Sequence, residues 1–305
     1  MDFDPRDYDS RRSERSGIER DPGSRGSADA PRQRDTEPRD VFVRDLRLPR
    51  GTEREVVHDS RDRAYTLRGS ESRTVATVGA FRVVPASRLR DHSGRAADPR
   101  DGDLRHLREQ GLIETVRLDG RRDAAVVLTG RGRDVLEASR EPARGARQQF
   151  YSGLKREREL EHDVQIYDAY VDASGRLAER DARIERVVLD YELKRDYQRW
   201  LHERDRDRDD HDGHPNRAAH EIQQWAADHD LPYFDDQVHF PDLRIEYVEL
   251  DGRVRHEDVE VMTVHYRGGH SAAVSRSGFS SFSLRQTWPR MSARLRMRLG
   301  CVTRN

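Results

Sequence analysis

The sequence predicts an α+β protein, in which a helical module with one β-hairpin precedes a mixed α/β region. Three observations support this prediction. Apolar residues recur at helical spacing from Ser70 to Leu107, and two alternating segments then flank Asp119-Gly120, a dipeptide typical of hairpin turns. Beyond residue 146, a long helical pattern is followed by further alternating segments. At 305 residues, the chain has the length of about two domains.

The composition restricts where an ordered core can form. Charged residues make up 38% of the chain and hydrophobic residues 33%, so a core is expected only where apolar residues concentrate. Residues 1–40 contain few large apolar side chains and are predicted to be a disordered tail. The single cysteine, Cys301, excludes an internal disulfide bond and a cysteine-clustered zinc site.

Charge and hydropathy set further limits on function. The formal net charge is −1, so a nucleic-acid-binding protein of this composition needs a local basic patch. No secretion signal and no apolar run near the ~20 residues of a membrane span is found, which predicts a cytoplasmic protein without a membrane partner. Residues 283–305 are rich in arginine and lack Asp and Glu. They are predicted to form a basic, irregular tail, with a basic amphipathic helix over 291–299 as the alternative.

Three helices are expected in the first module. Ser70 can cap a helix whose apolar residues recur up to Val84. Pro85 ends this helix and can open a short second one. The Asp98-Pro99 pair is typical of the start of a third helix, in which Leu104 and Leu107 are expected to face the core.

A hairpin and a closing helix follow. Gly111 can end the third helix in a left-handed conformation, and residues 112–118 and 124–128 alternate as two strands should. Thr129 can then cap a fourth helix. Three helices, a two-stranded wing and a closing helix are the order of the winged-helix fold, which we predict for residues 41–142.

The same residues resemble the MarR-like families of winged-helix proteins between residues 70 and 140. The motifs that carry the resemblance are Leu104-Arg-His-Leu107, Gln110-Gly-Leu-Ile113, Asp119-Gly-Arg121, Val127-Leu-Thr129 and Gly132-Arg133.

Arginines of this module are candidates for contact with double-stranded DNA. They lie on the third helix and at the tip of the hairpin: Arg100, Arg105, Arg108, Arg117, Arg121 and Arg122. The guanidinium group can bind a phosphate or a guanine edge through two hydrogen bonds, and the wing usually reaches the DNA backbone or minor groove. Two alternatives remain open: these are solvated charges of an arginine-rich chain, or the module mediates protein contacts.

The second module is predicted over residues 146–282. It opens with a long helix, roughly 146–180, whose apolar seam runs from Phe150 to Val171. The seam packs against the neighbouring domain or, alternatively, forms a homodimer through residues 150–171. The later elements expected are a strand over 183–194, a helix through Tyr197 and Trp200, a helix over 218–229, and strands over 243–250 and 257–266.

Acidic residues on these strands form a candidate metal site. Asp242 follows Pro241 at the start of one strand, and Glu260 lies on the next. Carboxylates on neighbouring strands hold a divalent ion in restriction-endonuclease-like domains. The lysine expected two residues after the second acid is replaced by Met262. Glu192 and Lys194, on one face of the predicted 183–194 strand, are candidates to complete the site.

The order of these segments resembles the replication-relaxation family of plasmid and mobile-element proteins. The matching residues are Glu161-His162-Asp163, Glu192-Leu193-Lys194, Pro241-Asp242 and Glu260. The resemblance implies a winged helix joined to a nuclease-like region, and association with replication or transfer of extrachromosomal DNA. Met262 departs from the family pattern and puts metal binding in doubt. His162 is either a packing residue at the helix–sheet boundary or a catalytic or ligand residue.

Three functions follow from these patterns. We predict a winged-helix protein that binds duplex DNA of a plasmid or mobile element, without catalysis and without a cofactor. The first alternative is a DNA nuclease that uses Asp242 and Glu260 with Mg²⁺ or Mn²⁺. The second is a dimerising protein-interaction adaptor. A Walker phosphate loop, a dinucleotide fingerprint and a serine-nucleophile elbow are not found.

Overall fold

The structure is a computed structural model that describes residues 37–118, 123–142, 146–154, 160–205, 217–262 and 275–283. All of these described residues belong to one compact unit by their contacts. The predicted tails therefore lie almost entirely outside the described residues. Helices and several sheets alternate along the chain, which confirms the mixed α+β class.

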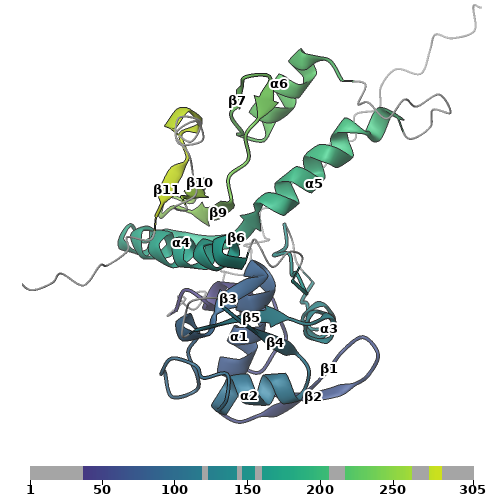
Figure 1. The fold of residues 1–305 in the computed structure, drawn as a ribbon, viewed down its shortest axis with the longest axis vertical. Helices are drawn as coiled ribbons and strands as arrows, with labels where there is room; N and C mark the ends of the chain where they lie inside the picture. The colour runs from purple at the N-terminus through teal and green to yellow at the C-terminus, as the bar shows by residue number, and fades with distance from the viewer. Residues whose placement is uncertain are drawn as a thin grey trace, which may run out of the picture. The chain divides into compact units, whose positions relative to one another are not determined.

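The N-terminal region, defined as described residues 37–154, holds the first set of elements (Figure 1). They are η1 (Asp40–Val43), β1 (Glu55–His58), β2 (Ala64–Leu67), α1 (Gly69–Phe81), β3 (Val83–Pro85), η2 (Ala86–Arg88), α2 (Gly102–Glu109), β4 (Ile113–Arg117), β5 (Ala124–Leu128) and α3 (Gly130–Ala138). Strands β3, β5 and β4 form an antiparallel sheet in that order, and β1 and β2 form a separate hairpin.

The start and end of α1 differ from the prediction for physical reasons. Ser70 does not cap the helix, because its hydroxyl donates to Asp103 at 2.6 Å. The Glu71 carboxylate instead accepts from the backbone N–H of Arg68 at 3.1 Å. The helix ends at Phe81, and Val84 lies in β3, so its placement in the helix was wrong.

The next elements agree with the prediction in kind but not in their bounds. The short second helix is only the 3₁₀ turn η2, and α2 begins at Gly102, after the Asp98-Pro99 pair. Leu104 and Leu107 are fully buried, and Gly111 has a φ of 71°, both as predicted. Strands β4 and β5 pair antiparallel, while the turn residues 119–122 lie outside the described part of the chain.

The C-terminal region, defined as described residues 160–283, holds the second set. It contains α4 (Leu160–Glu179), β6 (Arg183–Leu189), α5 (Asp190–Leu201), η4 (Glu203–Asp205), α6 (Ala219–Asp228), β7 (Tyr233–Phe234), β8 (Gln237–Val238), β9 (Leu243–Val248), β10 (Val254–Val261) and β11 (Ser280–Phe282). The main sheet has the order β11-β10-β9-β6, with only the β10–β11 pair parallel. Strand β10 begins at Val254, three residues before the start of the strand predicted over 257–266.

The long helix is shorter than predicted. Residues 146–154 are not helical, and α4 begins at Leu160. Phe150 is nevertheless buried, because the extended segment packs over Gly79, whose carbonyl accepts from the Tyr151 N–H at 2.8 Å. The segment is also bound to β6, since the Gln148 amide bonds both the N–H and the carbonyl of Val187 at 2.9 Å.

Helix α4 lies between the two sheets, with β3 on one side and β6, β9 and β10 on the other (Figure 1). The rings of Phe42, Phe81, Tyr167 and Tyr170 pack together at centroid distances of 5.0 to 6.1 Å. One hydrophobic core therefore joins both regions. Most described residues of the helix seam are buried by the chain itself, which favours the interpretation that the seam packs against the neighbouring domain. A homodimer through residues 150–171 stays an alternative. In the described residues, every helix is too short or too polar to cross a bilayer.

Candidate nucleic-acid interface

Helix α2 is held to α1 by buried charges. The Asp103 carboxylate on α2 accepts from Arg68 Nη2 at 2.6 Å and from the Ser70 hydroxyl at 2.6 Å. His106 Nδ1 lies 2.9 Å from Glu71 Oε1, and the Glu71 side chain is fully buried. A buried carboxylate is stable only when it is paired and hydrogen-bonded, so these contacts fix how α2 sits on the core.

The β1–β2 hairpin is fixed to the same helix. The side-chain amide of Gln110 accepts from the Thr66 N–H at 2.7 Å and donates to the Thr66 carbonyl at 3.0 Å. On the hairpin side, Arg54 Nη2 lies 2.7 Å from Glu71 Oε1. These contacts fix α2 both to α1 and to the β1–β2 hairpin, and so fix the position of its exposed face.

Predicted DNA-binding arginines fall into three classes. Arg100, Arg108 and Arg117 are exposed, and none forms an ion pair with a described residue. Arg105 is exposed but pairs with Glu109 one turn further on, at 2.7 Å. The remaining two predicted residues, Arg121 and Arg122, lie outside the described part of the chain.

Two arginines of the first turn of α3 were not predicted as site residues. Arg131 and Arg133 are exposed and form no ion pair with the rest of the described chain. A Cβ on Gly111 would lie 3.4 Å from Arg131 Nη1, so this guanidinium lies at the C-terminal end of α2. The alternation of small and basic residues from Gly130 to Arg133, directly after the Thr129 cap, was the signal available in the sequence.

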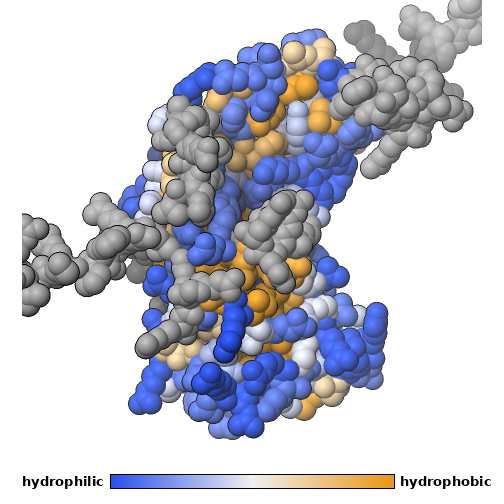
Figure 2. All heavy atoms as spheres, in the orientation of Figure 1, coloured by the Kyte–Doolittle hydropathy of each residue, from blue (hydrophilic) through white to orange (hydrophobic). Residues whose placement is uncertain are grey.

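The N- and C-terminal regions differ in how many of their described arginines form ion pairs. Each described Lys and Arg of the C-terminal region lies within ion-pair distance of a carboxylate: Arg176, Arg180, Arg183, Arg186, Lys194, Arg195, Arg199, Arg204, Arg217, Arg244, Arg253, Arg255 and Arg276. In the N-terminal region, the arginines that form no ion pair with a described residue are Arg47, Arg61, Arg82, Arg90, Arg95, Arg100, Arg108, Arg117, Arg131, Arg133 and Arg147. The face over α2 and the β1–β2 hairpin is covered mainly by hydrophilic residues (Figure 2).

The predicted metal carboxylate Asp242 is engaged by the protein. Its Oδ2 atom accepts from the Val261 N–H at 2.8 Å and lies 3.2 Å from His162 Nε2. Its backbone carbonyl accepts from the Asp190 N–H at 3.2 Å. Asp242 thus joins β9, β10 and the first turns of α4 and α5, which is the arrangement of a structural residue.

His162 lies between two carboxylates. Its Nε2 faces Asp242, and its Nδ1 is 3.7 Å from Asp163 Oδ1. Burial by itself would lower the pKa of His162, but the hydrogen bonds to Asp163 and Asp242 raise that pKa to about 10. A histidine that stays cationic at neutral pH neutralises Asp242 and is a poor general base. This favours the packing interpretation of His162.

Glu192 and Lys194 do not complete a metal site, and their predicted position on a strand was wrong. Strand β6 ends at Leu189, and both residues lie in α5. Glu192 is buried; its carboxylate accepts from the Tyr151 hydroxyl at 3.2 Å and lies 3.1 Å from Arg186 Nη1. Lys194 Nζ pairs with Asp190 at 2.7 Å, one helical turn away.

The acids of β10 have separate roles. Leu243 pairs with Val259 in the antiparallel register. Asp242 and Glu260, the neighbours of this pair, therefore lie at the same end of adjacent strands, as predicted. Asp258 is paired with Arg244 on the neighbouring strand, at 2.7 Å. Glu260 is buried, with 6% of its surface exposed. No group of three His, Cys, Asp or Glu side chains that could hold a metal ion occurs among the described residues.

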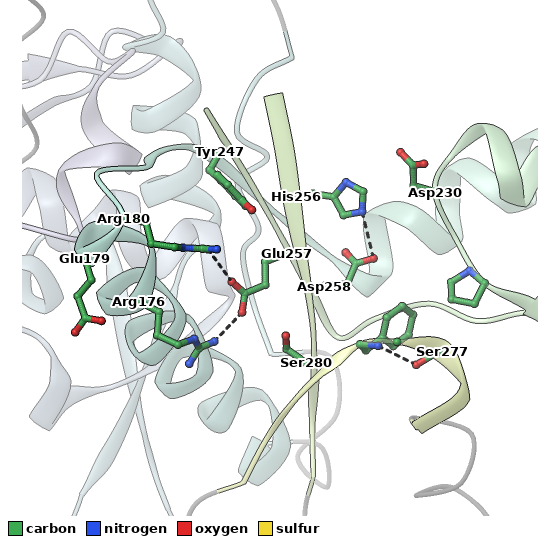
Figure 3. Close-up of a pocket in the computed structure, with 13 residues that line it drawn as sticks. Arg176, Glu179, Arg180, Asp230, Tyr247, His256, Glu257, Asp258, Ser277 and Ser280 are labelled. Carbon is green, nitrogen blue, oxygen red and sulfur yellow. Dashed lines mark hydrogen bonds and ion pairs between the residues drawn. The ribbon is translucent and has the colours of Figure 1, made fainter. Parts of the chain in front are cut away.

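A groove of about 750 Å³ lies beside β10 (Figure 3). On one wall, Arg176 and Arg180 both point to Glu257, at 2.7 and 4.0 Å. On the other wall, His256 lies 3.8 Å from Asp258. Asp258 is itself paired with Arg244 at 2.7 Å. Since Arg176, Arg180 and Asp258 each have a partner of opposite charge, these residues offer no unpaired charge to an ionic ligand.

Comparisons of the chain with protein-family models, with curated proteins and with solved structures find no match. The likeness to MarR-like modules and to the replication-relaxation family therefore stands on the motifs of the sequence alone.

Proposed function

We propose that this protein binds duplex DNA through a winged helix in the N-terminal region, with α2 as the recognition helix. The observation that carries the proposal is that exposed arginines without an ion pair to a described residue gather around α2, β4 and the start of α3, whereas each described Arg and Lys of the C-terminal region lies near a carboxylate. The order α1-β3-α2-β4-β5 and the sheet order β3-β5-β4 support the winged-helix assignment.

The chemistry of the interface follows from the placement of the arginines. Arg108 lies on the exposed face of α2, where a guanidinium can donate two hydrogen bonds to a guanine edge or a phosphate. Arg100 precedes the helix, and Arg117 leads into the hairpin that carries Arg121 and Arg122. Phosphate neutralisation by these residues gives salt-dependent affinity through release of counterions.

The biological setting that we propose is replication or transfer of a plasmid or other mobile element, as the resemblance to the replication-relaxation family implies. In this proposal the C-terminal region is not catalytic, because Asp242 is engaged by a histidinium and a backbone N–H. The DNA-binding region is joined to it through the shared core and the 146–154 segment.

Fluorescence anisotropy with labelled duplexes tests the proposal. We expect binding without a divalent ion that weakens steeply between 50 and 200 mM salt, as is typical of proteins that contact about six or more phosphates. Arg100→Ala with Arg108→Ala should weaken binding at least tenfold. Replacement of Arg253, an exposed arginine in the turn before β10, by Ala should not. Binding that ignores salt, or an unchanged affinity of the double variant, contradicts the proposal.

The same protein preparation tests the nuclease alternative. Incubation of supercoiled plasmid with Mg²⁺ or Mn²⁺ should leave the DNA intact. Cleavage that disappears in Asp242→Asn and Glu260→Gln variants would instead support the metal-dependent nuclease and refute the non-catalytic assignment.

A further inference from the structure

Arginines that form no ion pair with a described residue lie near both ends of α2. Near the N-terminal end they are Arg95 and Arg100. The loop of Arg95 is placed there by His92, whose Nδ1 lies 3.4 Å from Asp103 in the first turn of α2. Arg95 belongs to a tight turn in which Asp91 Oδ1 accepts from the N–H groups of Ser93 and Arg95, at 2.8 and 3.0 Å. The backbone N–H of Arg100 is fixed in the same way by Asp98, at 2.8 Å. Both side chains therefore extend from a defined backbone. We call Arg95 and Arg100 the leading pair.

Arg131 and Arg133, at the C-terminal end of α2, are the trailing pair. The loop that carries them is held to the end of α2, because the Thr129 hydroxyl donates to the Gly111 carbonyl at 2.6 Å and the Thr129 N–H donates to the Leu112 carbonyl at 3.0 Å. Gly132, between the two arginines, is buried, and the arginines are exposed on either side of it. Packing of Gly132 thus directs both guanidinium groups to the solvent.

The spacing of the pairs fits one dimension of DNA. Helix α2 has eight residues, so its ends are roughly 12 Å apart. The major groove of B-form DNA is about 12 Å wide and is bordered by the phosphates of the two strands. Between the pairs, Arg105 is neutralised by Glu109, so most of the positive charge of this face lies toward the two ends of the helix.

We infer that the leading and trailing pairs bind phosphates on opposite strands of one duplex, with α2 in the major groove between them. This inference rests on the proposed function and adds its docking geometry: the loop of residues 89–101 contacts one strand, and the first turn of α3 contacts the other. Two chain segments outside the helix and the wing thereby set the depth and the angle at which α2 enters the groove.

Salt titration of the binding constant measures the phosphate contacts of each pair. Arg95→Ala with Arg100→Ala, and Arg131→Ala with Arg133→Ala, should each lower the slope of log K against log salt by about 2 and weaken binding about 10- to 100-fold. The matched control is Arg47→Ala with Arg147→Ala, which removes two exposed arginines that also form no ion pair with described residues and are not adjacent to α2. The control should leave slope and affinity unchanged, and thermal unfolding should confirm that each variant is folded.

Duplexes with neutral methylphosphonate linkages on one strand then assign the strands. We expect modification of one strand to remove the effect of the leading-pair variant only, and modification of the other strand to remove the effect of the trailing-pair variant only. Dependence of both pairs on the same strand, or pair variants that behave like the control, overturns the inference. If those variants behave like the control while Arg108→Ala still weakens binding, the proposed function stands; if the unaltered chain does not bind duplex DNA, the proposed function itself fails.

Discussion

The N- and C-terminal regions are both rich in arginine, but the arginines make different contacts in the two regions. In the C-terminal region, arginines connect elements: Arg244 joins β9 to Asp258 of β10 and also donates to the carbonyls of His229 and Asp230 at 2.8 and 3.0 Å. In the N-terminal region, half-buried arginines such as Arg68 have the same role, while Arg100, Arg108 and Arg131 around α2 are exposed and form no ion pair with a described residue. Ion pairing therefore separates arginines that connect elements from exposed arginines that are candidates for binding, a distinction that composition does not make.

This difference has an energetic consequence. Exposed like charges near one another raise the free energy of the folded protein slightly, and an anionic partner removes that cost on binding. A buried ion pair behaves in the opposite way, because loss of one partner leaves a desolvated charge behind. Removal of a buried, paired arginine should thus lower stability, whereas removal of an exposed arginine beside α2 should lower the DNA affinity that we propose.

The largest effect is expected for Arg244→Ala. The side chains of Arg244 and Asp258 are 8% and 9% exposed, so the substitution leaves a buried carboxylate unpaired. We expect the free energy of unfolding to fall by about 3–5 kcal/mol in urea denaturation. By contrast, Arg108→Ala should change it by less than about 0.5 kcal/mol.

A double substitution separates the ion pair from simple loss of packing. Arg244→Met with Asp258→Leu removes both charges and should recover much of the lost stability, because isosteric apolar replacement of a buried pair is often neutral. If Arg244→Ala and Arg108→Ala lower stability equally, the contrast between the two regions is wrong.

Local signals predicted much of the fold. Thr129 accepts from the Gly132 N–H, Leu104 and Leu107 are buried, and β5 has the predicted bounds, because caps, helical spacing and alternation depend on neighbouring residues. Phe150 misled the prediction, since its burial comes from Gly79, which is distant in sequence. Apolar spacing cannot distinguish a helix from an extended segment that packs on a remote helix.

The candidate site was less predictable for the same reason. Exposure of Arg108 follows from the helical pattern, but neutralisation of Asp242 by His162 depends on packing of α4 against β9. Glu192 and Lys194 alternate in sequence as a strand would, yet they lie in a helix that begins directly after β6. The position of Arg131 near α2 depends on how the start of α3 lies against the end of α2, which the sequence alone does not show.

The pH dependence of stability gives the second prediction. The pKa of His162 is raised to about 10 in the folded protein from 6.5, so His162 stabilises the fold fully below about pH 6.5, and this contribution is lost as pH rises toward 10. The difference in unfolding free energy between the unaltered chain and His162→Gln should therefore shrink by roughly 3 kcal/mol between pH 6 and pH 10. Parallel urea titrations at several pH values measure it.

A difference that does not depend on pH would mean that His162 is neutral in the folded protein. In that case Asp242 would not be neutralised by a histidinium, and its charge would be available to a metal ion.

Two glycines of α3 give the third prediction, which tests whether packing sets the stability of the N-terminal region. A Cβ on Gly132 would overlap the Leu112 carbonyl and the Leu128 side chain, whereas a Cβ on Gly130 meets nothing within 4 Å. Gly132→Ala should lower the free energy of unfolding by about 2 kcal/mol, and Gly130→Ala should change it by less than about 0.5 kcal/mol. Equal effects in thermal unfolding would contradict this packing.

The smallest expected effect concerns the one neutralised arginine on the exposed face of α2. The side chains of Arg105 and Glu109 are each 56% exposed, and a pair this exposed contributes little to stability. Glu109→Gln should leave the unfolding transition almost unchanged. It removes a carboxylate that repels phosphate and leaves Arg105 without its partner, so duplex affinity should rise about threefold at low salt, and less at high salt. Glu137→Gln, which breaks the Glu137–Arg140 pair at the far end of α3, is the matched control and should have no effect on affinity. A Glu109→Gln variant that binds no better than the control would mean that the α2 face does not contact the duplex, and the exposed arginines around it would need another partner.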